Sequence, residues 1–142
     1  MGMFDMLDVS ASGMTAQRLR LDVISNNIAN VNTTRSSEGG PYRRERVVFQ
    51  EKREKKTFSD YLKNSKPAGV RVASIQKDDA PFKTVYDPTH PDADEEGFVD
   101  MPNVDMLKEM VDLIAAARAY EANVTAINAE KNMALKALEI GR

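Results

Sequence analysis

The chain has 142 residues, a formal net charge of −2 and no cysteine. The absence of cysteine excludes disulfides, thiolate chemistry and most zinc sites, so packing and assembly are expected to hold the fold together. No apolar run approaches the roughly 20 residues that a membrane-spanning helix needs, and the amino end lacks the cationic start and long apolar run of a cleaved secretory signal.

The nearly balanced total charge conceals two blocks of opposite sign. Residues 35–66 carry ten Lys or Arg against five Asp or Glu, whereas residues 78–112 carry two Lys against eleven Asp or Glu. Two interpretations remain open: the blocks are two solvated faces, or the basic block of one subunit meets the acidic block of another. Because Glu45, Glu51 and Glu54 interrupt the basic block, nucleic acid is not expected as a partner.

The first predicted element is an amphipathic helix over residues 6–31. Its apolar residues recur at heptad spacing, at Leu7, Met14, Leu21, Ile24, Ile28 and Val31. Gly13 weakens the early part, so Ser10 or Ser12 could cap a helix that begins only near Met14. The helix is predicted to end in the asparagine-rich run 26–34, because asparagine tolerates left-handed backbone geometry and bonds locally to the main chain.

The middle of the chain predicts loops and short strands. β-Branched and aromatic residues favour strands over residues 42–50, 70–75, 82–86 and 98–99, which together make a small sheet. Val70, Val72 and Ile75 are expected to face inward. The interval 51–66 is charged and without clear period, and it could be a helical turn or disordered. A segment this small with so few strands is marginal as an independent module.

The longest periodic signal runs through residues 103–140, which contain no glycine or proline. A heptad-like seam is predicted at Met106, Met110, Leu113, Ala117, Tyr120, Val124, Ile127, Ala134 and Leu138. A second row, Leu107, Val111, Ile114 and Leu135, makes the stripe wider than one partner helix covers. Asn103 is expected to cap this helix and Gly141 to end it, while Lys131 either sets the register or lies on an exposed stretch.

Together these elements predict an α+β fold in three parts. Residues 1–34 form the amino-terminal helix with its asparagine-rich motif, residues 35–102 form a small β-rich middle segment, and residues 103–142 form the long carboxy-terminal helix. The two amphipathic helices are expected to pair as an antiparallel, coiled-coil-like hairpin. The apolar surface that this hairpin leaves uncovered must be buried by neighbouring subunits.

Only one stretch resembles a metal site. Asp92, Asp94 and Gly97 imitate the opening of an EF-hand loop, but Asn103 stands where a bidentate glutamate is required. An acidic hairpin tip is therefore the favoured interpretation, and a soluble calcium-binding interaction module is the alternative. His90, the only histidine, is expected to be a turn residue. The chain has no nucleophile elbow, phosphate-binding glycine loop or HExxH motif, so neither an enzyme nor a cofactor is predicted.

Both ends resemble the signatures of one family. Residues 10–33, most specifically Asn27, Asn30 and Thr33, resemble the amino-terminal signature of flagellar axial proteins of the rod and hook type. Residues 109–123 resemble the matching carboxy-terminal signature. The middle segment and the last nine residues are similar to one member of the basal-body rod proteins, found in the proximal rod. The resemblance therefore covers almost the whole chain.

This resemblance implies a structural subunit of the flagellar basal-body rod, outside the cytoplasmic membrane, that polymerises helically and transmits torque. It also implies export through the flagellar type III apparatus and assembly with copies of itself and with other rod proteins; another rod or hook-type subunit is the runner-up. The residues expected to serve packing and assembly are Leu21, Ile24, Asn27, Ile28, Asn30, Thr33, Met110, Leu113, Ala117, Arg118, Tyr120, Glu121, Asn123, Val124, Ile127 and Leu138.

Overall fold

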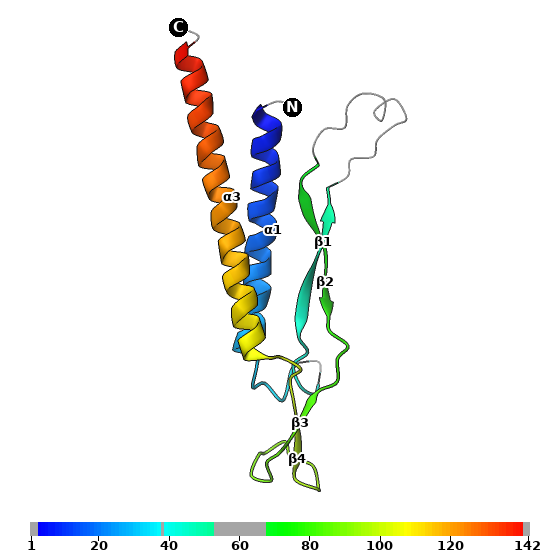
Figure 1. Cartoon of the computed structure of the whole chain (residues 1–142). Helices are drawn as coiled ribbons and strands as arrows, with labels where there is room; N and C mark the ends of the chain where they lie inside the picture. Colours follow the sequence, from blue (N-terminus) through cyan, green and yellow to red (C-terminus); the bar gives the residue numbers. More distant parts are fainter. Residues whose placement is uncertain (1–2, 38, 53–67, 141–142) are drawn as a thin grey trace, which may run out of the picture.

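Two long helices and two small sheets make up the chain, in a computed structural model that describes residues 3–37, 39–52 and 68–140 (Figure 1). The elements in order are α1 (Met3–Ala29), β1 (Glu45–Glu51), β2 (Val70–Lys77), β3 (Lys83–Tyr86), β4 (Phe98–Met101) and α3 (Met106–Ile140). The predicted α+β fold is confirmed. The predicted stop at Gly141 and most of the undecided interval 51–66 lie outside the described residues.

The two helices run antiparallel and pack along each other, with both chain ends at the same end of the molecule (Figure 1). The expectation that α1 begins near Met14 was wrong, because the helix is continuous from Met3. Ser12 does not cap it. Its Oγ donates to Val9 O at 2.7 Å and accepts from Val70 N at 3.1 Å, so this serine joins the middle of α1 to β2.

The asparagine-rich run ends α1, as predicted. Asn30 donates from both its backbone N and its side-chain Nδ2 to Asn26 O, and its Oδ1 accepts from Thr33 Oγ1 at 3.1 Å. Among the described residues only glycines have positive φ, so asparagine ends this helix by local hydrogen bonding and not by left-handed geometry.

The strands form two separate antiparallel hairpins, β1–β2 and β3–β4, where one small sheet was expected. In the first, Val48 pairs with Ser74 but Phe49 pairs with Val72, so Ala73 is the extra residue of a bulge. The prediction that Ile75 faces inward was wrong, since it is 47% exposed. A two-stranded sheet covered by a single helix leaves much of its surface open, and this is the physical reason for the exposure.

Helix α1 is the centre of the fold, because α3 and the β1–β2 hairpin both contact it, from different sides. Few hydrophobic residues are buried within the described part of the chain: Ala16, Val23, Ile24, Val99, Val104 and Ala116. Such a thin core supplies little burial energy for an elongated chain.

On α3, every second position of the observed seam is one residue before the predicted one: Glu109, Ala116 and Asn123 take the places predicted for Met110, Ala117 and Val124. Buried or half-buried residues occur at strict heptad steps through Glu109, Leu113, Ala116, Tyr120, Asn123, Ile127, Glu130 and Ala134. The predicted seam residues Ala117 and Val124 are half-buried beside this line. Met106, Met110 and Leu138 were predicted on this seam but are 45%, 50% and 72% exposed. Lys131 is exposed, and Glu130 takes the seam position beside it. The apolar pattern misled the prediction because three of the true positions are polar.

Candidate functional site

The junction where α1 ends and α3 begins contains two fully buried polar side chains, Asn27 and Glu109. Asn27 lies near the end of α1 and Glu109 near the start of α3. Asn27 Nδ2 donates to Glu109 Oε2 at 2.9 Å. A hydrogen bond therefore joins the two helices at the point where an apolar seam contact was expected.

Asn27 uses its full hydrogen-bonding capacity. Its Nδ2 also donates to Glu45 O at 2.8 Å, and its Oδ1 accepts from Glu45 N at 2.9 Å and from Tyr42 Oη at 3.0 Å. An asparagine amide offers two donors and two acceptor positions, and all four are engaged. One side chain thus fixes α1, the start of β1 and α3 relative to one another.

Arg44 neutralises the buried carboxylate of Glu109. Its Nε donates to Glu109 Oε1 at 2.6 Å, and its terminal nitrogens lie 3.4 Å from Asp78 Oδ2 and 3.5 Å from Asp112 Oδ2. Burial alone lowers the pKa of Arg44, but the hydrogen bond and charge of Glu109, with Asp78, outweigh it and raise that pKa. The guanidinium is therefore a permanent cation among three carboxylates.

Tyr42 is held in its neutral form. Burial, followed by the charges of Glu45 and Glu109, raises the pKa of the Tyr42 phenol to about 12. A protonated phenol can donate to Asn27 Oδ1, whereas a phenolate could not. The electrostatics of the junction therefore favour the hydrogen bond that Tyr42 makes.

Asn103 joins the loops of the junction and does not cap α3 as predicted. Its Oδ1 accepts from Arg44 N at 2.8 Å, and its Nδ2 donates to Asp78 O and Ala80 O, both at 3.0 Å. The cap is Asp105, whose Oδ1 accepts from Leu107 N at 3.0 Å. An N-cap acts on the amides two and three residues ahead, and α3 begins too late for Asn103 to reach them.

The basic and acidic blocks meet within one chain, which neither interpretation of the sequence anticipated. Besides the pairs of Arg44, Arg35 of the basic block lies 2.6 Å from Asp92 of the acidic block. Arg20 of α1, outside the basic block, lies 3.3 Å from Asp112. Because these contacts involve only part of each block, exposed charges of both signs remain on the surface.

The predicted assembly residues fall into separate groups. Those on the seam or half-buried beside it are Leu21, Ile24, Ile28, Leu113, Ala117, Tyr120, Asn123, Val124 and Ile127. Asn30 and Thr33 form the turn after α1, and only Asn27 belongs to the buried junction. Arg118 and Glu121 pair with each other at 3.2 Å on the exposed side of α3, with Arg118 80% exposed. Met110 and Leu138 are exposed.

The roles of Tyr42, Arg44 and Glu109 were not predicted from the sequence. The apolar pattern gives no signal for Glu109, because a charged residue on an amphipathic helix is ordinarily assigned to the solvated face. Tyr42 and Arg44 lie in the segment just before β1, and no local periodicity indicates which side chains they contact.

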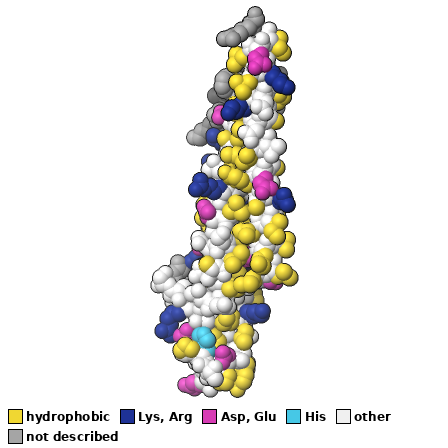
Figure 2. Space-filling model, turned by 90° about the vertical axis from the view of Figure 1, so that its left-hand side faces the viewer, with side chains coloured by type: hydrophobic (Ala, Val, Ile, Leu, Met, Phe, Trp, Pro, Cys, Tyr) yellow, Lys and Arg dark blue, Asp and Glu magenta, His cyan; other side chains and the backbone are white. Residues whose placement is uncertain are grey.

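The opposite side of α3 carries exposed hydrophobic residues. Leu107, Met110, Val111 and Ile114 are 50% to 73% exposed and follow the i, i+3, i+4, i+7 spacing of one helical face. We call these four residues the outer row. Figure 2 shows hydrophobic side chains running along the side of the molecule on which α3 lies. The second row predicted from the sequence is thus largely present as uncovered surface.

The acidic loop has local structural roles. Asp92 binds Thr34 and Arg35, while Asp94 Oδ1 accepts from Glu96 N and Phe98 N. His90 lies in the same turn, where its Nδ1 accepts from Asp92 N at 3.1 Å. Within the part of the chain that the structure describes, no three His, Cys, Asp or Glu are grouped as a metal site, and neither helix is long and apolar enough to cross a membrane.

Comparison with known proteins connects this arrangement to a family. Residues 7–35 match the family described as "Flagella basal body rod protein", and residues 95–140 match "Flagellar basal body rod FlgEFG protein C-terminal". The chain is 52% identical to the flagellar basal-body rod protein FlgC of Borreliella burgdorferi, over 99% of this chain and 98% of that protein. The chain belongs to the FlgC family.

Two further relatives carry the same name. The FlgC protein of Bacillus subtilis is 53% identical over 98% of each chain, and that of Salmonella typhimurium is 39% identical over the full length of both. The chain is accordingly a structural subunit of the flagellar basal-body rod, not an enzyme, and it assembles with other rod proteins. The resemblance noted in the sequence is confirmed, and the two matched segments contain Asn27 and Glu109 respectively.

Proposed function

We propose that this subunit polymerises helically in the proximal rod and transmits torque through contacts of its terminal helices. The supporting observation is the outer row on α3, which stays exposed although the other side of the same helix is already packed on α1. Exposed apolar surface of this kind marks a protein interaction site. Neighbouring subunits of the rod would bury it.

The buried junction has a mechanical role in this proposal. Torque transmission requires that the helices and the strands of a subunit move as one body. Asn27 and Arg44 cross-link α1, β1, the loop at Asp78 and α3 through buried or half-buried hydrogen bonds, several of them to charged groups. Such polar contacts are directional, so they resist changes of angle that purely apolar packing would tolerate.

Substitution of the outer row tests the polymer contact. Ile114→Asp is expected to abolish swimming while the protein remains folded, because it places a charge on the face that neighbours bury. Ala80→Asp is the matched control: it adds the same charge at an alanine that is also exposed but lies in the loop between β2 and β3, outside α3. The measurements are motility and the amount of the chain in isolated basal bodies. Normal swimming with Ile114→Asp would overturn the proposal.

We also propose that the chain leaves the cell through the flagellar type III export apparatus, using its amino-terminal segment. Membership of the rod family supports this route, since a rod subunit must pass the cytoplasmic membrane before it assembles. Replacing the first residues by an unrelated sequence should retain the chain in the cytoplasm. Unchanged incorporation into basal bodies after that replacement would argue against this route.

A further inference from the structure

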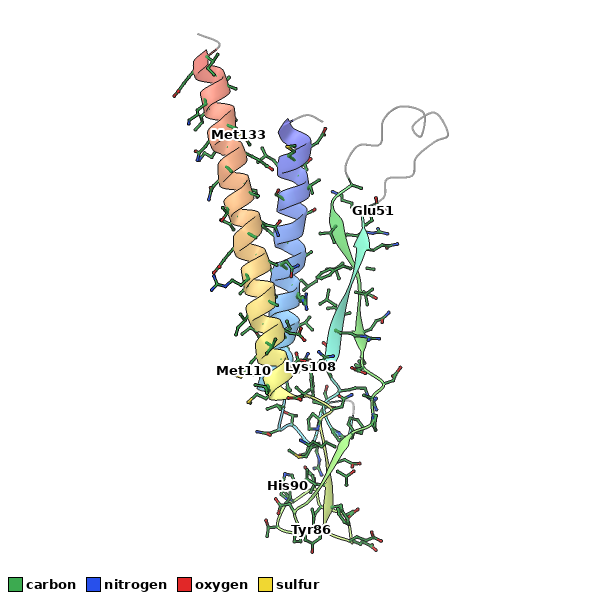
Figure 3. The ribbon with its side chains drawn as sticks, viewed as in Figure 1. Glu51, Tyr86, His90, Lys108, Met110 and Met133 are labelled. Carbon is green, nitrogen blue, oxygen red and sulfur yellow. The ribbon has the colours of Figure 1, made fainter. Side chains whose placement is uncertain are left out.

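The β3–β4 hairpin holds an aromatic pair at the surface. Tyr86 and Phe98 meet edge to face, with ring centroids 5.3 Å apart and planes at 67°, yet they are 65% and 40% exposed. Gly97 lies against this pair, where a Cβ would come within 3.0 Å of Tyr86 Cε2. Figure 3 places Tyr86 and His90 at the end of the molecule remote from the chain termini.

Asp100 and an acidic loop lie next to these rings. Tyr86 pairs with Phe98 and Thr84 with Asp100 in the hairpin register, so alternation places all four side chains on one side of the sheet. The connecting loop adds the exposed residues 94–96, Asp-Glu-Glu. We call this surface, made of these four side chains and residues 94–96, the aromatic–acidic face.

A surface of the opposite character lies on β1–β2. The side chains of Glu45, Val47 and Phe49 alternate with those of Arg46, Val48 and Gln50 along β1. Val47 and Phe49 are half-buried, as are their neighbours Val70 and Val72 on β2, whereas Arg46 and Gln50 are exposed. The second set therefore points mostly to solvent, although Arg46 also lines the cavity of about 240 Å³ between β1 and α1. By register, the residues that share this outward side are Arg46, Val48, Gln50, Arg71, Ser74 and Gln76. These six residues, which we call the arginine face, include two exposed arginines and no Asp or Glu. Arg71 donates to Gln50 Oε1 at 3.0 Å within the face, and the charge of Arg46 also acts on the nearby carboxylate of Asp78.

The two faces match in chemistry. Arginine stacks on aromatic rings and pairs with carboxylates, and arginine, tyrosine and phenylalanine are enriched in protein interfaces. The chain already makes both contacts internally: Arg43 lies 4.5 Å from the ring centroid of Phe82, and Arg35 pairs with Asp92 at 2.6 Å. The exposed arginines, aromatic rings and carboxylates of the two faces can form the same kinds of contact between chains.

We propose that the aromatic–acidic face binds the arginine face of a second copy of this chain, an inference that rests on the proposed polymer. The β3–β4 hairpin lies beyond the junction, whereas β1–β2 lies beside α1 (Figure 1). The faces therefore sit at different levels of one molecule. Two different surfaces meet in such a contact, so it is head-to-tail and repeats from copy to copy, as a polymer requires.

Disulfide cross-linking in isolated basal bodies tests the contact directly. The chain has no cysteine of its own, so Glu95→Cys and Ser74→Cys, one in each exposed face, introduce the only thiols. Mild oxidation of the double variant is expected to give covalent dimers and higher multimers of this chain. Each single variant, and a control that pairs Glu95→Cys with Asn26→Cys at an exposed position of α1, should remain monomeric.

Charge reversal provides a second measurement. Position 95 already carries a cysteine in the double variant, so the charge of the acidic face is changed at its neighbours. Adding Glu96→Lys and Asp94→Asn to the double-cysteine chain should abolish the multimers. Arg46→Glu with Arg71→Glu should abolish them too, and combining all four changes should restore them. Rods that contain the chain but give no multimers, or cross-links to another protein only, would overturn this inference and leave the proposed function intact. Absence of the unsubstituted chain from the rod would instead refute the proposed function.

Discussion

Asn27 Nδ2 and Glu109 Oε2 lie 2.9 Å apart in the fully buried interior, and they tie the last turns of α1 to the first turns of α3. The two residues are 82 positions apart in sequence. This hydrogen bond fixes the register of the amino-terminal helix against the carboxy-terminal helix. Arg44 of the middle segment neutralises the Glu109 carboxylate. All three parts of the chain thus meet at one place.

Asn27→Ala is expected to lower the free energy of unfolding by roughly 3 kcal/mol, because it leaves Glu45 N, the Tyr42 phenol and a Glu109 oxygen without partners in a buried space. Urea denaturation of the purified subunit measures the loss. Asn26→Ala is the control, since Asn26 is the exposed neighbour, and it should change stability by less than about 0.5 kcal/mol. Equal effects of the two substitutions would contradict the role of Asn27.

The two helices and their antiparallel pairing could be predicted from sequence, because heptad spacing is a local property of the sequence. It indicates an amphipathic helix even when single seam positions are assigned one residue away. Leu113, Tyr120, Ile127 and Ala134 were placed on the seam correctly. The alternate seam positions, Glu109, Ala116 and Asn123, were each predicted one residue too late, because two of them are polar. Whether a polar side chain is buried depends on partners elsewhere in the chain. Hydrophobic periodicity contains no information about those partners.

The junction and the two separate hairpins could not be predicted for a related reason. Arg44 pairs with Asp78 and Glu109, which are 34 and 65 residues away, so its role exists only once the chain has folded. The bulge at Ala73 likewise depends on the register with β1, which the sequence of β2 alone does not define.

Gly13 weakens α1 as an isolated helix but has a packing role in the hairpin. A Cβ at this position would lie 3.0 Å from Asn123 Oδ1, and Asn123 Nδ2 is held by Ala119 O at 2.9 Å. Gly13→Ala should therefore raise the free energy of unfolding only slightly in the otherwise unsubstituted chain. In the background of Asn123→Ala it should stabilise by about 1 kcal/mol, the usual helix-propensity gain. Thermal unfolding of the four chains of this cycle gives the coupling; the same effect of Gly13→Ala in both backgrounds would refute the contact.

Alkaline pH should weaken the junction through Tyr42. Its pKa is raised from the usual 10.0 to about 12 in the folded chain, so between these values the unfolded phenol loses its proton while the folded phenol keeps it. The folded state then binds more protons, and stability falls as pH rises through this window. Denaturation midpoints measured from pH 9 to about 12 should fall less steeply for Tyr42→Phe. Identical pH profiles for the two chains would show that Tyr42 does not contribute.

Protection against hydrogen exchange should be graded along α3 in the dilute subunit. Its buried residues, Glu109 and Ala116, lie in the half of the helix next to the junction, whereas the last ten residues, 131–140, are exposed except for Ala134. Few buried contacts mean a low free energy of local opening, so amides near the carboxyl end should exchange fastest. Burial in the rod should then slow exchange along the whole helix, because neighbouring subunits cover its outer row. Uniformly strong protection over residues 104–138 in the monomer would show that α3 is stable without assembly, and the rod would then gain nothing from ordering it.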